Sequence, residues 1–287
     1  MSGYIEPVSN LSEAWLRTLE EVYAKGGHAI NIMSTVADPL SDEDPVVRQA
    51  IDNLLVTGHR AGTRVQSVET VAGTLFPRDL YADPGYFYRS DLNDPGKAVL
   101  DTAAGDLYEA YIDMLPVLCT DTANARGTYF GRMVSWPGKT GGGRNQLADR
   151  VTTLRRALDS NHQKRNLDDI VVAGEAEGLL DGDPAGVQVY AASDRRSRGF
   201  PCLVHIDLTV FQGRLSMAAV YRHQFLVTKA YGNLLGLSRL LKFLAQQSGF
   251  AVGELVVHAT MADCEQGTYT KAAVAKLISA ARGEARP

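Results

Sequence analysis

The sequence predicts a fold of the α+β class, in which helices and strands are not regularly alternated. Apolar residues recur at helical spacing in several ranges of the first 120 residues. Residues 202–219 instead alternate with the period of two that is typical of β-strands. No regular succession of one strand and one helix appears, which argues against a doubly wound sheet. We expect the 287 residues to form a single domain over 1–287.

Helices are predicted wherever apolar residues recur every three or four positions. Pro45 suits the first turn of its helix, because proline lacks the N–H that this turn leaves unpaired. Residues 234–247 are apolar nearly all round, which indicates a buried helix. Residues 66–76 have no clear assignment. The remaining predicted helices are 10–24, 45–57, 97–118, 146–158 and 271–282.

A strand, a tight turn and a second strand are predicted from Cys202 to Ala219. Gln212-Gly213 is the turn signal between them. Shorter strands are expected at 187–191 and 255–260, and exposed loops at 138–143 and 173–186. One face of the first strand should carry Cys202, Val204, Ile206, Leu208 and Val210, and the other Leu203, His205, Asp207 and Thr209.

The bulk composition narrows the possible partners. A net charge of −4 argues against non-specific binding to nucleic acid, which needs a basic face. The three cysteines lack the paired spacing of a disulfide framework or a zinc site, so we expect no metal. No signal peptide and no run of 18 apolar residues is present, so we expect a cytoplasmic protein without a membrane partner.

Three residues near the predicted hairpin have side chains suited to nucleotide chemistry. Cys202 offers a thiol nucleophile, Arg222 a fixed cation and Asn233 an amide that can both donate and accept. Each also has an ordinary structural alternative. Cys202 could be a buried strand residue, Arg222 a solvated or ion-paired arginine, and Asn233 the cap of the helix that follows.

The order of these residues resembles the catalytic half of thymidylate synthase. The likeness extends from Cys202 to about Asp263, with weaker similarity at 127–137 and at 145–147. It implies a three-layer sandwich with a bent mixed sheet that packs back to back in a homodimer. The catalytic half would span about 187–270, and the N-terminal part, 1–126, diverges from the family.

The resemblance implies a role for each matching residue. The thiolate of Cys202 would add to C6 of a uracil-type ring, and Arg222 would bind the phosphate of a pyrimidine nucleoside monophosphate. Asn233 would pair with O4 and N3–H of the base, which suits uracil better than cytosine. Glu69 would organise water and proton transfer at the base. Arg165 would reach across the dimer, with Arg196 as the alternative.

Several positions depart from the family pattern. His223 replaces a serine that holds phosphate, and it could still donate to phosphate. Phe225 replaces an aspartate that contacts the folate ring. Asp263 and Glu265 stand where sugar-hydroxyl ligands are expected, and their carboxylates could accept hydrogen bonds from a ribose diol. The chain ends at Pro287, about 22 residues beyond Glu265, so a truncated C-terminus without the family's folate lid is expected.

These observations predict an enzyme that transfers a one-carbon unit, methyl or hydroxymethyl, to C5 of a uracil-type nucleotide. The implied donor is 5,10-methylenetetrahydrofolate, although the missing lid favours hydroxymethylation over full reduction. The alternative is a non-catalytic nucleotide-binding or partner-binding protein on the same scaffold. Loss of the family's histidine, serine and aspartate favours that alternative, whereas retention of Cys202, Arg222 and Asn233 together favours the enzyme.

Overall fold

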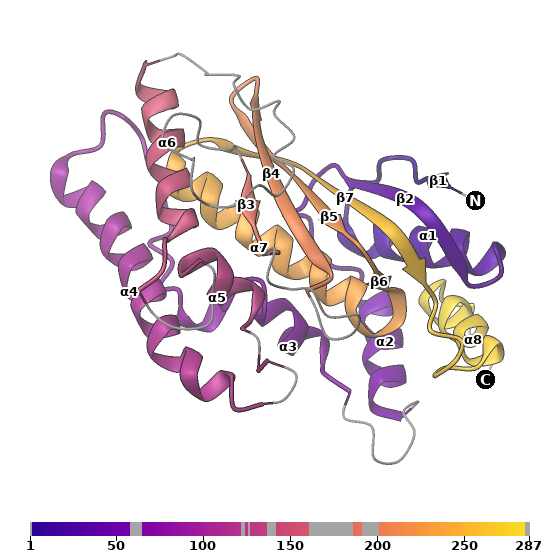
Figure 1. Cartoon of the computed structure of the whole chain (residues 1–287). Coiled ribbons are helices and arrows are strands. Elements are labelled where there is room, and N and C mark those ends of the chain that lie inside the picture. Colours follow the sequence, from indigo (N-terminus) through magenta and orange to yellow (C-terminus); the bar gives the residue numbers. More distant parts are fainter. Residues whose placement is uncertain are drawn as a thin grey trace. The chain divides into compact units, whose positions relative to one another are not determined.

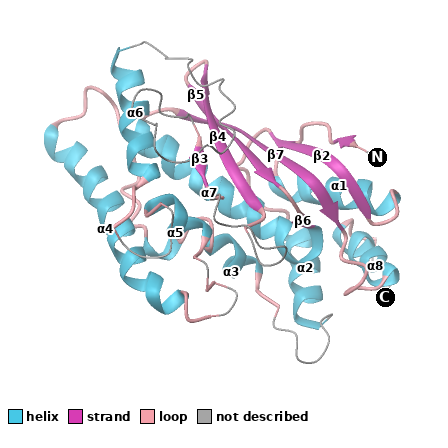
Figure 2. Cartoon of the chain, in the orientation of Figure 1, coloured by secondary structure: helices cyan, strands magenta, loops and turns pink. Residues whose placement is uncertain are grey.

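The computed structural model describes most of the chain and contains both helices and strands. Its helices make up 50% and its strands 21%, which fits the predicted α+β class (Figure 2). The predictions for Arg165, Arg196 and most of the 138–143 and 173–186 loops lie outside the described residues. The structure describes residues 2–57, 65–121, 124–125, 127–136, 142–160, 186–190 and 201–284.

The described strands form one open mixed sheet. Their order is β1-β2-β7-β5-β4-β3, and β6 also pairs with β7. β2 runs antiparallel to β7 and β3 antiparallel to β4, whereas β1 is parallel to β2 and β6 to β7. The bounds are β1 (Gly3–Tyr4), β2 (His28–Val36), β3 (Val187–Gln188), β4 (Leu203–Phe211), β5 (Arg214–Tyr221), β6 (Gln224–Phe225) and β7 (Ala251–Asp263).

The chain divides into two compact units. The first comprises Met1–Leu75, Ala218–Arg239 and Gly253–Pro287, and the second Phe76–Met217 and Leu240–Val252. The boundaries between the units fall within β5, β7 and the long helix α7 (Tyr231–Ser248). A single domain over residues 1–287 therefore remains a prediction.

Helices of the first unit pack on β2 and on one another (Figure 1). α1 begins where the side chain of Asn10 accepts the N–H of Glu13 at 2.9 Å, which satisfies one unpaired donor of the first turn. α1 contacts β2, α2 and α8, and α2 contacts α8. The predicted helices at 10–24, 45–57 and 271–282 are confirmed as α1 (Leu11–Ala24), α2 (Pro45–Thr57) and α8 (Lys271–Ala281).

The short helix α3 (Val68–Gly73) packs very closely against the start of α7. A Cβ on Gly232 would lie 2.8 Å from the carbonyl oxygen of Val68, and one on Gly236 2.7 Å from that of Ala72. Any larger side chain at either glycine would push the helices apart, because backbone atoms cannot give way as a flexible side chain can. α3 resolves the unassigned range 66–76 and carries Glu69.

The second unit has an aromatic core between its helices. Phe76 packs against Tyr81, Phe130 and Phe243 with ring centroids 5.3 to 6.0 Å apart, and Tyr111 lies 4.8 Å from Phe130. α4 starts at Asp94, earlier than the predicted residue 97, because Asn93 caps it through the N–H of Gly96. The helices of the second unit are α4 (Asp94–Leu118), α5 (Tyr129–Val134), α6 (Gln146–Ser160), the 3₁₀ turn η1 (Arg78–Leu80) and the end of α7.

The predicted hairpin is confirmed, although the predicted alternation of its first strand is partly wrong. Gln212 and Gly213 both have positive φ, 49° and 75°, as a tight two-residue turn requires. Ile206 and Leu208 are buried as predicted, but Leu203, which was assigned to the opposite face, is also fully buried. No described helix is long and apolar enough to cross a membrane.

Candidate functional site

Cys202 lies beside a partly buried tyrosine, Tyr129, in the second unit. Cys202 directly precedes β4, is partly exposed and is not in a disulfide. The Oη atom of Tyr129 accepts the N–H groups of Cys202 at 3.2 Å and Leu203 at 3.4 Å. Burial, followed by the charge of a Cys202 thiolate, raises the pKa of Tyr129 to about 12. Tyr129 is therefore a neutral phenol near pH 7, with its own proton available for donation.

Tyr129 lies in α5, which is connected by hydrogen bonds to segments that are distant in the sequence. Thr128 caps α5 by accepting the N–H of Gly131 at 3.1 Å. The side chain of Gln146 donates to the carbonyls of Arg132 and Gln188 and accepts the N–H of Gln188 at 2.7 Å. The two stretches with weaker family likeness, 127–137 and 145–147, are thus joined by hydrogen bonds. Sequence reasoning missed Tyr129, although it lies inside the first stretch.

Asn233 lies at the third position of α7, in the first unit. It is 5% exposed, and its carboxamide forms no hydrogen bond with a residue that the structure describes. The π-helical turn η2 (Leu226–Ala230) runs directly into α7, so Asn233 lies within the helix and does not cap it. Its side-chain atoms are not among the fully buried polar atoms that lack a partner, so the carboxamide is open to water or to a ligand.

Arg222 and His223 lie in the loop between β5 and β6, also in the first unit. Arg222 is exposed, and its carbonyl accepts the hydroxyl of Thr260 at 2.7 Å. The His223 ring lies against Phe225 with centroids 4.4 Å apart. Nε2 of His223 is 3.5 Å from Oδ2 of Asp263, which is within ion-pair range. A phosphate site at Arg222 and His223 remains a prediction.

The partly buried carboxylate of Glu265 already has hydrogen-bond partners inside the chain. It accepts the N–H groups of Val227 and Thr228 at 2.9 and 2.8 Å, and the hydroxyl of Thr228 at 2.7 Å. Burial raises the pKa of Glu265 despite these bonds. Asp263 accepts the N–H of Glu265 at 2.6 Å. Both carboxylates therefore have internal partners, which weakens the expectation that they read a ribose diol.

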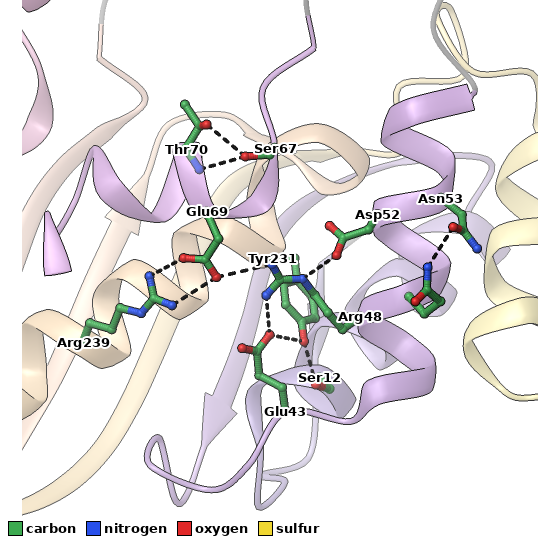
Figure 3. A network of polar contacts seen from close by, with 11 residues as sticks. Ser12, Glu43, Arg48, Asp52, Asn53, Ser67, Glu69, Thr70, Tyr231 and Arg239 are labelled. Carbon is green, nitrogen blue, oxygen red and sulfur yellow. Dashed lines mark hydrogen bonds and ion pairs between the residues drawn. The ribbon is translucent and has the colours of Figure 1, made fainter. Parts of the chain in front are cut away.

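Glu69 lies in a network of ion pairs and hydrogen bonds that joins α1, α2, α3 and α7 (Figure 3). It accepts two hydrogen bonds from Arg239, at 2.7 and 3.1 Å, and one from Arg48 at 3.3 Å. The hydrogen bond from Arg239 is the main reason that the pKa of Glu69 is lowered. The carboxylate therefore stays ionised near neutral pH, where it cannot supply a proton. The role in proton transfer that the sequence predicts for Glu69 therefore has an alternative, in which its ion pairs with Arg48 and Arg239 serve only to join the helices.

The other side of the same network holds the buried hydroxyl of Tyr231. Tyr231 donates to Glu43 at 2.8 Å, and its hydroxyl lies 2.9 Å from that of Ser12. Arg48 binds Glu43 and Asp52, both at 2.9 Å. Of these contacts, only the one between Arg48 and Asp52 has a signal in the sequence, because residues four positions apart on a helix lie close enough to pair.

The predicted site residues divide between the two units. Cys202 belongs to the second unit, and Arg222, Asn233 and Glu69 belong to the first. The convergence of the thiol with the other three side chains remains a prediction. Among the described residues, no group of three or more His, Cys, Asp or Glu side chains could hold a metal ion.

Comparison with known proteins adds no family assignment. No protein-family model matches the chain, and no curated protein matches it.

Proposed function

We propose that the protein is a pyrimidine-nucleotide enzyme on a thymidylate synthase-like fold. Its substrate would be a uracil-type nucleoside monophosphate, attacked at C6 by the thiolate of Cys202. The observation that carries this proposal is Asn233, whose side chain is 5% exposed and lies within α7, where it does not cap the helix. One face of such an amide offers a donor and an acceptor side by side, which matches O4 and N3–H of uracil.

The surroundings of Cys202 support the covalent step. Addition of the thiolate to C6 places the electron pair at C5 and O4 as an enolate, which can then attack an electrophilic carbon. Loss of the C5 proton and expulsion of the thiolate restore the ring. Tyr129 lies at the cysteine with a hydroxyl that burial keeps protonated, so it can donate a hydrogen bond to sulfur or ring.

The described residues do not fit folate as the one-carbon donor. Phe225 takes the position of the family's folate-binding aspartate, and its ring packs against His223 instead. A phenyl ring offers no hydrogen bond to a pterin, so we derive no step through 5,10-methylenetetrahydrofolate. Transfer of a methyl or hydroxymethyl group to C5 is part of the proposal, whereas the donor is not assigned.

Exchange of the C5 hydrogen tests the addition step without any donor. The protein is incubated with [5-³H]-dUMP or [5-³H]-UMP, and tritium released to water is counted. We expect release by the unaltered protein, loss of release in Cys202→Ala, and unchanged release in the matched control Cys119→Ala. No release from either nucleotide, together with no adduct of 5-fluoro-dUMP on Cys202 by mass spectrometry, contradicts the enzyme.

The second candidate is a nucleotide-binding protein without catalysis on the same scaffold. Glu69 favours it, because the carboxylate expected to manage protons is instead bound by two arginines. Tight nucleotide binding that is unchanged in Cys202→Ala, without tritium release, identifies this alternative. A thermal-shift screen measures such binding, because a ligand held only by the folded state raises the melting temperature.

We also propose that the protein is a homodimer in the cytoplasm. The paired strands β1, β2 and β7 carry four large exposed apolar side chains, Tyr4, Ile30, Met33 and Met261. Tyr4 is paired with Met33, and Ile30 with Met261, in the strand register. Apolar side chains grouped on strands are typical of an interface. The three cysteines, which form no disulfide, fit a reducing compartment.

A further inference from the structure

One carboxylate at the end of β7 lies between two histidine rings. Oδ2 of Asp263 is 3.5 Å from Nε2 of His223, and Oδ1 is 3.4 Å from Nδ1 of His28. The side chain of His28 is 61% exposed, whereas those of His223 and Asp263 are 35% and 15% exposed. Water screens the pair with His28 more strongly, so Asp263 acts mainly on His223.

The His223 ring has two close neighbours, the carboxylate of Asp263 and the ring of Phe225. The ring packs against Phe225 at an interplanar angle of 31°. Its Nε2 atom is buried and, although within ion-pair distance of Asp263, forms no hydrogen bond with a described residue. A carboxylate beside Nε2 favours a proton on that nitrogen. In the neutral ring Nδ1 then carries a lone pair, which repels an anion until the ring takes up a second proton.

We propose that Asp263 is a positioning residue for His223, and that His223 binds the substrate phosphate only as an imidazolium, so that phosphate binding takes up a proton. This inference rests on the proposed function, because it takes the nucleotide phosphate as the ligand. It replaces the sugar contact that the sequence suggested for Asp263. Arg222, the preceding residue, supplies the permanent cation for the same phosphate.

The charges around His223 support uptake of a proton when an anion binds. Asp263 lies 3.5 Å from Nε2 of the ring, and Arg222 directly precedes His223 in the chain. A phosphate dianion adds two negative charges and so shifts the balance toward the protonated ring. Among the residues that the structure describes, the titratable and charged groups on the neighbouring elements include Asp263 of β7, Glu265 after it, His28 of β2, Arg222 of the same loop and Lys229 of η2.

Isothermal titration calorimetry with dUMP measures the proton directly. Titrations at pH 7.5 in two buffers with different ionisation enthalpies give the number of protons taken up per nucleotide bound. We expect an uptake by the unaltered protein that is absent for deoxyuridine, which has no phosphate. The affinity for dUMP should fall by up to about tenfold for each pH unit above neutrality, the limit for one linked proton.

Three variants separate positioning from a merely structural role. Asp263→Asn should weaken dUMP binding by about tenfold and abolish the uptake, because the ring can then place its single proton on Nδ1. Asp263→Glu, which keeps the charge, should restore part of the uptake. His223→Ser lacks the imidazole, so any proton uptake that it still shows comes from titration of the phosphate itself. That value is subtracted from the uptake of the unaltered protein. His28→Gln is the matched control and should behave as the unaltered protein.

The outcomes distinguish this inference from the proposed function. Binding of dUMP without proton uptake, or with the same uptake in His223→Ser and the unaltered protein, overturns the inference and leaves the nucleotide site standing. Proton-linked binding of inorganic phosphate without binding of dUMP or UMP supports the histidine site and contradicts the nucleotide proposal. Failure of phosphate, dUMP and UMP to bind overturns both.

Discussion

Two glutamates of the first unit show opposite pKa shifts. Glu69 is half exposed and bound by two arginines, and its pKa is lowered. Glu265 is largely buried, accepts hydrogen bonds from Val227 and Thr228, and its pKa is raised. Neutral donors offset only part of the cost of burying a carboxylate, whereas guanidinium groups favour the charged form. The sequence alone does not show which of the two glutamates is the more suitable acid.

The comparison bears directly on which carboxylate could handle a proton. A group with a lowered pKa is a poor proton donor near pH 7, and Glu69 is in that state. Glu265 has the more suitable shift, but its oxygens hold the start of η2. Glu265 therefore has a pKa that suits a proton donor, but its oxygens are already bonded inside the chain. Glu69 is more exposed, but its lowered pKa makes it a poor proton donor.

The largest predicted effect is the loss of Glu265. Glu265→Ala leaves the N–H groups of Val227 and Thr228 without their acceptor, and we expect the free energy of unfolding to fall by about 2–4 kcal/mol. Urea unfolding followed by circular dichroism measures it. The exposed Glu6→Ala is the control, with an expected change of less than about 0.5 kcal/mol. A loss at Glu265 no larger than at Glu6 would show that its three hydrogen bonds are not stabilising.

A smaller effect is expected when α3 is pushed from α7. Gly236→Ala brings a methyl group to 2.7 Å from the carbonyl oxygen of Ala72, and we expect a loss of about 1–3 kcal/mol. Gly105→Ala is the matched control, because nothing lies within 4 Å of its new methyl group. It should stabilise α4 by about 0.4–1 kcal/mol. Equal melting temperatures for the two variants would contradict the close packing that positions Glu69.

The smallest effect separates the two glutamates by pH. The ion pairs of Glu69 should contribute about 0.5–1 kcal/mol, present above the unfolded-state pKa of about 4.3 and lost as pH falls through the lower folded-state value. Glu265 has the opposite sign, because its folded-state pKa is raised. Its contribution is fully present below about pH 4.3 and is lost as pH rises through the folded-state value.

Unfolding of Glu69→Gln and Glu265→Gln between pH 3 and pH 8 tests both signs. The advantage of the unaltered protein over Glu69→Gln should shrink in acid, and added salt should reduce it at neutral pH. Its advantage over Glu265→Gln should instead grow as the pH falls from neutral toward about 4.3. Parallel pH profiles for the two variants would contradict the contrast between their environments.

Much of the fold was predictable because it depends on local rules. Helical spacing located α1, α2, α4, α6 and α8 within a few residues, and Gln212-Gly213 identified the hairpin turn. The misassigned face of Leu203, the first residue of β4, shows the limit of such rules, since neighbours in the folded chain decide its burial. Side-chain partners were not predictable, because Glu69 and Arg239 meet across 170 residues of sequence.

The sequence by itself determined most of the longer helices and the hairpin, and it identified Cys202, Arg222 and Asn233 as candidates for binding a uracil nucleotide. Periodicity and residue type are local properties, so they can be recognised in the sequence without a structure. Only the tertiary structure decided that Glu69 is ionised between arginines, that Glu265 is buried against η2, and that Tyr129 lies at Cys202. Charge state and hydrogen bonding depend on neighbours in space, which folding brings together from distant parts of the chain.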